Sequence, residues 1–115
     1  MRMWMAPVEL MCVKHLLGEH VETHMFLGSL KAGRNLLGFF ERGLLEPESL
    51  LRRHDELAYE IVRRGYSHKS PMDGDVLREA LSGLASMQRK ARVDRDASLR
   101  ELVRRCPECA KKAAR

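Results

Sequence analysis

Signals for β-strands are nearly absent from this sequence. Its β-branched residues are few and never alternate with polar residues over a window long enough to form a strand. Apolar runs are short as well, since no stretch reaches the length of about 18 residues that a membrane-spanning helix needs. The start of the chain also lacks the apolar region and the small-residue cleavage site of a secretion signal. These absences predict a helical protein that stays inside the cell and spans no membrane.

Aromatic residues and cysteines are scarce too. One Trp, two Tyr and three Phe are too few for a surface that stacks the bases of a single strand. The three cysteines are an odd number, and thiols inside a cell are normally reduced. Cys12 lies in a helical pattern, so we interpret it as a small buried apolar residue.

Charge is abundant by comparison. The chain contains 21 Lys and Arg residues against 16 Asp and Glu, which gives a net charge of +5 and a pI of about 9.4. Such a basic excess favours polyanionic partners, most often nucleic acid. A basic domain without such a partner is the alternative. With 115 residues, of which 44% are hydrophobic, the chain is long enough for one domain with a modest core and too short for two.

Helical periodicity accounts for most of the chain. A first helix is predicted over about 8–32, with Gly33 as its stop, and 33–46 is predicted to be a loop with apolar anchors. The residues of this helix that we expect in the core are spaced three or four apart: Leu10, Val13, Leu17, Val21, Met25 and Gly28.

The second predicted helix has the clearest boundaries. Pro47 suits its first position, and Gly65 ends it. Glu60 and Arg64 lie four residues apart on this helix, so an ion pair is expected between them. The face expected in the core consists of Leu50, His54, Leu57, Ala58, Ile61 and Val62.

Two further helices are predicted after a turn rich in Gly, Pro and Ser. The third covers about 75–92 and the fourth about 96–105, where Ser98 and Glu101 have the spacing of a capping box. The residues expected inside are Leu77, Ala80, Leu81, Leu84, Met87, Leu99, Leu102, Val103 and Cys106.

The basic tail, 107–115, is expected to be frayed. The sequence as a whole predicts an all-α fold, a compact single domain over 1–115 with three to four helices.

The stretch HLLGEHVETHMF places several titratable side chains on the first helix. His15, Glu19 and Glu22 are spaced i, i+4 and i+7 and share one edge, whereas His20 and His24 share another. Three interpretations stay open. The two histidines of the second edge could bind a metal with a third ligand, or the segment could be an ordinary solvated face. Alternatively, one of the two carboxylates serves a DNA or sugar site as an acid, a base or an electrostatic group, with a pKa raised by desolvation.

The motif CPEC near the end of the chain pairs Cys106 with Cys109. One such pair is half of a zinc site, and the chain contains no second pair. The motif follows a helix without a βαβ unit, which argues against a thioredoxin-type function. A helix end with two thiols, a zinc ion shared across a dimer, and a disulfide bond are the interpretations left open.

Two blocks of the sequence are similar to a known family in order and spacing. KHLLGEHVETHMFLGSL, 14–30, resembles the catalytic helix of the phage pyrimidine-dimer DNA glycosylases of the endonuclease V type. SLLRRHDELAYEIVRRGYSHKSP, 49–71, resembles their second helix and the turn after it. The resemblance covers about residues 1–71, and the combination HLLGEH with RHDELxxExxxRGYxHxSP is fairly specific. It implies an endonuclease V-like, all-α fold.

The resemblance also implies a mechanism and its residues. Enzymes of that family flip a base out of the duplex, cleave its glycosidic bond with the N-terminal α-amine, and nick the strand by β-elimination. Their assisting glutamate corresponds to Glu22, their helix histidine to His15, and the arginine beside the nucleophile to Arg2. The nucleophile itself corresponds to Met1. An α-amine titrates at about 7.7–8.0, against about 10.4 for Lys, so much more of it is neutral and nucleophilic at neutral pH.

Two features depart from the family pattern. Val21 and Met25 occupy the positions of two arginines that grip DNA in the family, and the aromatic-rich C-terminal segment is missing. The resemblance therefore leaves the lesion undefined.

Basic side chains supply the expected contacts with DNA phosphates, which set affinity and carry no sequence information. We assign this role to Arg2, Lys31, Arg34, Arg63 and Arg64.

The predicted function is that of a DNA glycosylase with AP-lyase activity. Its partner is duplex DNA with a damaged or modified base, no metal or organic cofactor is implied, and a monomer in the cytoplasm of a bacterial or phage-infected cell is expected. A non-catalytic DNA-binding relative of the same fold is the alternative, and a metal-dependent enzyme that uses His20 and His24 is a third.

Overall fold

The computed structural model describes residues 1–115 and consists of helices and connecting loops, without strands. The predicted all-α fold is confirmed, although the helices are shorter and more numerous than expected. None of them combines the length and the hydrophobicity required to cross a bilayer. In chain order the helices are η1 (Val8–Leu10), α1 (Val13–Lys31), α2 (Leu37–Glu41), η2 (Pro47–Ser49), α3 (Leu50–Arg63), α4 (Gly74–Ser82), α5 (Ser86–Arg89), α6 (Arg95–Arg105) and α7 (Pro107–Ala113), where η marks a 3-10 helix.

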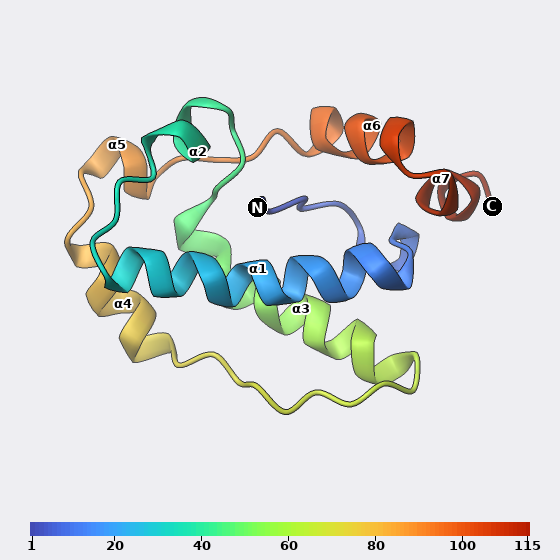
Figure 1. The fold of residues 1–115 in the computed structure, drawn as a ribbon, viewed down its shortest axis with the longest axis horizontal. Coiled ribbons are helices and arrows are strands. Elements are labelled where there is room, and N and C mark those ends of the chain that lie inside the picture. The colour runs from blue at the N-terminus through green and yellow to red at the C-terminus, as the bar shows by residue number, and fades with distance from the viewer.

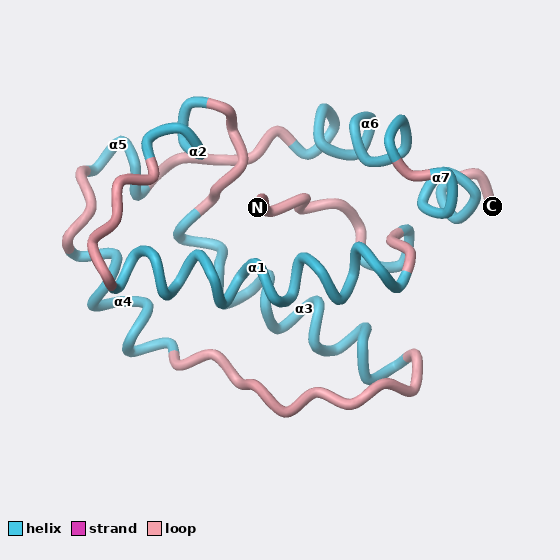
Figure 2. Tube along the Cα trace, viewed as in Figure 1, coloured by secondary structure: helices cyan, strands magenta, loops and turns pink.

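Helix α1 runs through the centre of the molecule (Figure 1). Helices α3 and α4 pack against it, while α6 and α7 lie on the opposite side of the molecule (Figure 1). A long loop without helix returns from the end of α3 to the start of α4 (Figure 2). The first residues of the chain run between α1 and α6 (Figure 1). The N-terminus is thus placed near the middle of the fold.

The N-terminal segment is extended and buried. Met3, Trp4, Met5 and Ala6 are each at most 9% exposed. The Met3 backbone N–H donates to the carbonyl of Leu44 at 2.8 Å, and the hydroxyl of Ser98 on α6 donates to the carbonyl of Trp4. These hydrogen bonds to a loop and to a side chain satisfy backbone groups of the segment, which can therefore be buried without forming a helix.

Helix α1 buries a different face from the one its apolar spacing predicts. Val13, Leu17, Val21 and Met25 are 37–55% exposed. The residues that are buried instead are Leu16, Glu19, His20, Thr23, Phe26 and Leu30. The predicted core stripe was wrong, because several polar residues of α1 find partners inside the protein and can therefore be buried.

The most deeply buried polar contact of α1 is an ion pair with α3. Arg53 donates to the two carboxylate oxygens of Glu19 at 2.6 and 2.8 Å, and both side chains are at most 2% exposed. The backbone N–H of Met5 also donates to Glu19 at 3.4 Å. This geometry is bidentate, which fixes the side chains relative to each other.

The boundaries of α3 follow the prediction closely. Pro47 opens the 3-10 turn before it, and Gly65 follows its end with a φ of 92°, a conformation that suits glycine. The expected ion pair is confirmed, with Arg64 Nε 2.8 Å from Glu60 Oε2. Val62 is the exception, because it is 56% exposed and not part of the core.

The loop predicted over 33–46 contains the short helix α2. Its apolar anchors are confirmed, since Leu36 and Leu45 are at most 6% exposed. Gly33 ends α1 with a φ of 69°, as expected for a helix stop.

The third predicted helix is broken into α4 and α5 near Gly83. Met87, expected in the core, is 89% exposed because it lies on the short helix after this break. Gly83 makes a break at this position understandable, because Gly has a low helix propensity and little helix-stabilising free energy is lost when the helix ends there.

The predicted capping box of α6 was also wrong. Asp94 caps this helix by accepting the N–H of Ala97 at 3.0 Å. Ser98 lies inside the helix, where it bonds to the N-terminal segment. The tail after α6 is not frayed but forms α7, whose Cys109 is 1% exposed. Packing against the rest of the protein, rather than propensity, explains the order of this short helix.

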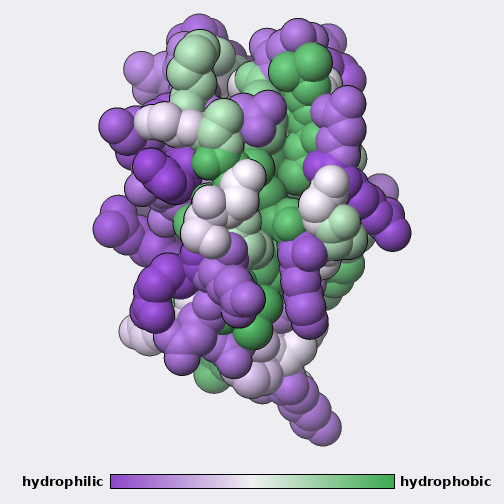
Figure 3. All heavy atoms as spheres, turned by 90° about the vertical axis from the view of Figure 1, so that its left-hand side faces the viewer, coloured by the Kyte–Doolittle hydropathy of each residue, from purple (hydrophilic) through white to green (hydrophobic).

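Two hydrophobic clusters make up the core. One joins Met3 and Met5 to the second half of α1 and to α4, and the other joins Trp4 to α3, α6 and α7. Seen from the end of the molecule at which α1 finishes, hydrophobic atoms form a band flanked by hydrophilic side chains (Figure 3). Both clusters contain residues of the N-terminal segment, so this segment connects the two halves of the core.

Candidate active site

The amino terminus lies beside a carboxylate of α1. The Met1 nitrogen is 4.0 Å from Oε1 of Glu22, and the backbone N–H of Arg2 donates to Oε2 at 3.2 Å. The Glu22 side chain is 27% exposed, so it is accessible from solvent. The N-terminal segment is extended and runs beside α1. Its first two residues therefore lie next to Glu22.

Partial burial raises the pKa of Glu22 from its ordinary value of 4.5. The hydrogen bond from the Arg2 backbone and the attraction of the N-terminal ammonium oppose this shift. A carboxyl group with a raised pKa exchanges protons more readily near neutral pH than an ordinary surface glutamate. The pair of groups therefore combines an amine with a nearby proton carrier.

The structure separates the roles of the two glutamates on this edge of α1. Glu19 is fully buried and paired with Arg53, which leaves it no access to a ligand. Glu22 is open to solvent and faces the amine. The spacing alone leaves the choice between the two carboxylates open, because it puts both on one edge, whereas the family resemblance selects Glu22.

The side chain of Arg2 is held next to the N-terminal segment. Its guanidinium lies 3.7 Å from the centre of the Trp4 ring, a cation–π contact, and its Nη2 donates to Ser98 Oγ at 3.4 Å. Burial, and then repulsion from Arg105, lower the pKa of Arg2 below its ordinary value. Its Nε is buried without a hydrogen-bond partner.

A hollow beside Arg2 is lined by two further arginines, Arg42 and Arg92, by one acidic residue, Asp94, and by neutral residues that include Ala97 and Ser98 of α6. No sequence motif distinguishes Arg42 or Arg92 from the other arginines. The three arginines come from distant parts of the chain, and no local pattern connects them. Such a group of guanidinium ions suits a phosphate.

The other basic residues selected from the sequence do not form one cluster. Lys31 ends α1 and Arg63 ends α3, and these two helix ends lie at opposite ends of the molecule (Figure 1). Arg34 is exposed beyond the end of α1. Both Arg63 and Arg64 bond to Glu60, and Arg64 also donates to the carbonyl of Val8 at 3.0 Å. Arg64 thus has a clear structural role, and its predicted contact with DNA stays a prediction.

His15 lies among cysteine side chains. Its Nδ1 is 3.3 Å from Sγ of Cys12 and 3.8 Å from Sγ of Cys109, and its ring meets the edge of Trp4. No hydrogen bond joins it to Met1 or Glu22. The catalytic role that the resemblance implies for His15 therefore stays a prediction.

The two histidines of the other edge meet two more histidines in the fold. His20 and His24 of α1 lie against His54 of α3 and His68 of the loop after it, with ring centres 4.8–5.1 Å apart. The sequence does not identify a third ligand for His20 and His24, whereas the structure brings two further histidines to them. However, Nδ1 of His54 faces the Asp55 carboxylate at 2.8 Å and Nε2 faces the carbonyl of Ser70 at 2.9 Å. Both are hydrogen-bond acceptors, so they compete with a metal for the ring nitrogens of His54 in this orientation.

The surface around Glu22 is apolar where the family has arginines. Val21 is 55% exposed and Met25 is 51% exposed. Both are close to Glu22 in the sequence and lie on the exposed surface of α1. Their apolar character is thus a property of the candidate site and not of the core.

A comparison with protein families finds a match to the part of the chain that contains Met1 and Glu22. A family model described as pyrimidine dimer DNA glycosylase matches residues 1–74. No curated protein and no solved structure matches the chain.

Proposed function

Because the chain belongs to the pyrimidine dimer DNA glycosylase family, we propose that it removes a damaged base from duplex DNA with the amine of Met1 and then nicks the strand. The observation that carries this proposal is the 4.0 Å distance between the Met1 nitrogen and Oε1 of Glu22. The DNA glycosylase family implies a DNA substrate. The amine nucleophile, the role of the glutamate and the lyase step are our proposal.

The proposed reaction begins with the neutral amine. It attacks C1′ of the flipped nucleotide, the C1′–N bond to the base breaks, and the base leaves with the bonding electrons and takes up a proton. Loss of the amine proton and opening of the C1′–O4′ bond give an iminium, and O4′ receives a proton. Removal of a C2′ proton then expels the 3′ phosphate by β-elimination. Water finally releases the sugar fragment and restores the amine.

Glu22 is suited to the proton transfers of this sequence. As a carboxylate, it stabilises the positive charge that develops on the sugar when the base leaves. It can also accept a proton from the amine and return one to O4′, because its raised pKa brings the two protonation states closer in free energy at neutral pH. Its 4.0 Å distance from the amine leaves little reorganisation before a direct hydrogen bond forms.

The hollow lined by Arg2, Arg42 and Arg92 suits a phosphate of the damaged strand. Arg2 connects the two parts of the site, since its backbone bonds to Glu22 while its side chain lines the hollow. A phosphate held there would keep the sugar of an adjacent nucleotide close to the amine.

Borohydride trapping on a duplex with an abasic site tests the nucleophile. Reduction of the iminium should link the protein to DNA, and peptide mass spectrometry should locate the link at the Met1 amine. Intact mass should show that Met1 begins the mature chain. A short N-terminal extension should prevent trapping, because it removes the amine from Glu22 while leaving the buried residues after Met1 unchanged. A link at a lysine, or trapping that survives the extension, would contradict the proposal.

Replacement of the carboxylate tests its role separately. Glu22→Gln should reduce the single-turnover rate of base excision by about 10²–10⁴-fold, the usual contribution of an acid–base group. Binding of duplex DNA should change little. Glu41→Gln, at an exposed position on α2, is the control and should retain full activity. Undiminished excision by the Glu22 variant would contradict the role assigned to this carboxylate and would point to another acid–base group.

A further inference from the structure

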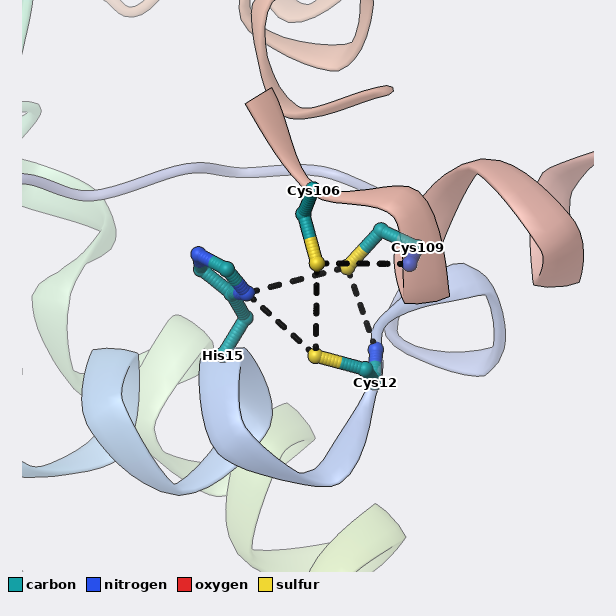
Figure 4. Close-up of side chains that lie close together, drawn as sticks. All are labelled: Cys12, His15, Cys106 and Cys109. Carbon is teal, nitrogen blue, oxygen red and sulfur yellow. Dashed lines mark hydrogen bonds between the residues drawn. The ribbon is translucent and has the colours of Figure 1, made fainter. Parts of the chain in front are cut away.

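Four side chains that bind metals meet at one place in the fold, although they come from the two ends of the chain. Cys12 directly precedes α1, and His15 lies in its first turn. Cys106 lies between α6 and α7, and Cys109 lies in the first turn of α7. Figure 4 shows the four side chains pointing toward one another, and their Sγ and Nδ1 atoms all lie within 4.8 Å.

The separations between these atoms match the edges of a zinc tetrahedron. Zn–S bonds of about 2.3 Å and a Zn–N bond of about 2.0–2.1 Å give edges of about 3.8 Å between sulfurs and about 3.6 Å between sulfur and nitrogen. Cys12 Sγ is 3.8 Å from Cys106 Sγ. His15 Nδ1 is 3.3 Å from the sulfur of Cys12 and 3.8 Å from that of Cys109. An ion would thus fit with only small side-chain adjustments.

We propose that these four side chains bind one zinc ion as a Cys3His site. Thiolate and imidazole ligands in a tetrahedral arrangement favour zinc over the harder divalent ions. Protein side chains would fill all four positions, which leaves no place for water or substrate on the metal. The site is therefore structural, and it does not depend on the function proposed above.

Backbone donors and basic side chains surround the proposed sulfur ligands. The backbone N–H of Cys12 donates to Cys109 Sγ at 3.2 Å, and that of Cys109 donates to Cys106 Sγ at 3.4 Å. Such donors stabilise thiolates. Zinc with three thiolates carries one net negative charge, and the adjacent hollow is lined by four cationic residues and one acidic residue: Arg64, Lys111, Lys112, Arg115 and Glu108.

The proposed ion would join the start of α1 to α7. Helix α7 has only seven residues and lies outside the part of the chain that matches the family. Cys109 belongs to the same hydrophobic cluster as Trp4 and Leu16. Since the His15 ring also meets the edge of Trp4, zinc would stabilise both the C-terminal helix and the segment that positions Met1.

The sequence does not show the complete site, because its two halves lie far apart along the chain. The CPEC motif alone is half of a zinc site, and the sequence leaves a dimer open as the source of the other half. In the structure the second pair is Cys12 and His15 of the same chain, a C-x-x-H motif instead of a second C-x-x-C.

Metal analysis of the full chain tests the proposal directly. Protein purified under reducing conditions without chelator should contain about one zinc ion per chain. Metal-free protein should bind cobalt(II) with the intense visible bands of a tetrahedral complex and a sulfur-to-metal charge-transfer band. Zinc should compete for that site and raise the melting temperature, since it binds only the folded site.

Two variants locate the ion. Cys106→Ala, at a half-buried position, should weaken zinc binding by about 10-fold or more. His68→Ala is the matched control in the histidine cluster and should retain one zinc ion. If Cys106→Ala does not fold, the cobalt titration of the unaltered chain still decides the question.

Three results would overturn the proposal. One is reduced, unaltered protein that binds neither zinc nor tetrahedral cobalt. Another is zinc lost from His68→Ala but retained by Cys106→Ala, which would place the ion in the histidine cluster. The last is protein in which two cysteines form a disulfide under reducing conditions, detected as a mass lower by two hydrogens.

Discussion

At the scale of single residues, buried charge explains much of this fold. Glu19 and Arg53 are enclosed between α1 and α3, at most 2% exposed, and satisfy each other with two hydrogen bonds. Removal of an ion from water is costly, and the cost is offset only while both partners are present. The pair therefore fixes the register of the two helices more than it adds to their stability.

We predict that loss of one member of this pair is far more damaging than loss of both. Arg53→Met should destabilise the protein by about 3–5 kcal/mol, because it leaves a buried carboxylate unpaired. The double variant Glu19→Gln with Arg53→Met should recover most of that loss. Urea unfolding followed by circular dichroism measures both.

A surface pair provides the comparison. Arg78 and Asp75 are at least 80% exposed, so Arg78→Ala should change the unfolding free energy by about 0.5 kcal/mol or less. If Arg53→Met were equally mild, the carboxylate of Glu19 would have to be neutral or solvated in the folded protein.

At the scale of elements, α1 shows how hydrophobic spacing can mislead. Its apolar positions three and four apart face solvent, while a face containing a glutamate, a histidine and a threonine is buried. Spacing identifies a helix and its edges correctly. Which edge is buried depends on partners from other elements, and no local pattern contains them. For α3, by contrast, the predicted apolar face is buried except for Val62.

The exposed edge of α1 can be tested by placing charge on it. The double variant Val21→Arg with Met25→Arg should fold with nearly unchanged stability, since both positions are more than half exposed. It should bind duplex DNA more tightly at low salt. The slope of log K against log salt should steepen by up to about 1.8, the effect of two added phosphate contacts.

Leu16→Ala on the buried face is the contrasting variant, expected to cost about 2–5 kcal/mol. Thermal melting and fluorescence anisotropy with a labelled duplex measure the two effects. Unfolding of the double arginine variant would show that Val21 and Met25 belong to the core after all.

At the scale of the whole molecule, four histidines from three parts of the chain meet in one cluster. Burial, followed by repulsion from His54, His24 and His68, lowers the pKa of His20 from 6.5 to about 4. The Nε2 atom of His20 is also buried without a partner. The folded protein thus holds this ring neutral at pH values where the unfolded chain protonates it.

Stability should consequently fall in mild acid. Between pH 6.5 and about 4 the unfolded chain binds a proton at His20 that the folded chain does not, so the free energy of unfolding decreases as the pH falls through this range. The loss is on the order of 3 kcal/mol at most. Urea unfolding across this pH range should show the decline in the wild type and a shallower decline in His20→Gln. Equal slopes in the two proteins would assign the acid sensitivity to other groups.

A second acid-sensitive group titrates at lower pH and can be distinguished. The hydrogen bond from Arg63, together with that from Arg64, lowers the pKa of Glu60 from 4.5 to about 2. Its contribution is present above pH 4.5 and is lost as the pH falls toward 2. The decline between pH 6.5 and 4.5 therefore reports the histidine cluster alone among these groups.

The sequence by itself determined the all-α class, the boundaries of α3 and the glycine stops at Gly33 and Gly65, because these depend on local backbone chemistry. The two blocks that resemble the family lie within the matching residues 1–74, and the two residues that the resemblance selected, Met1 and Glu22, lie side by side. Only the tertiary structure decided which face of α1 is buried, which glutamate is accessible, and which side chains complete the half zinc site of CPEC. Each of these depends on residues far apart in the chain, and their contacts exist only once packing has brought α1, α3, α7 and the N-terminal segment together.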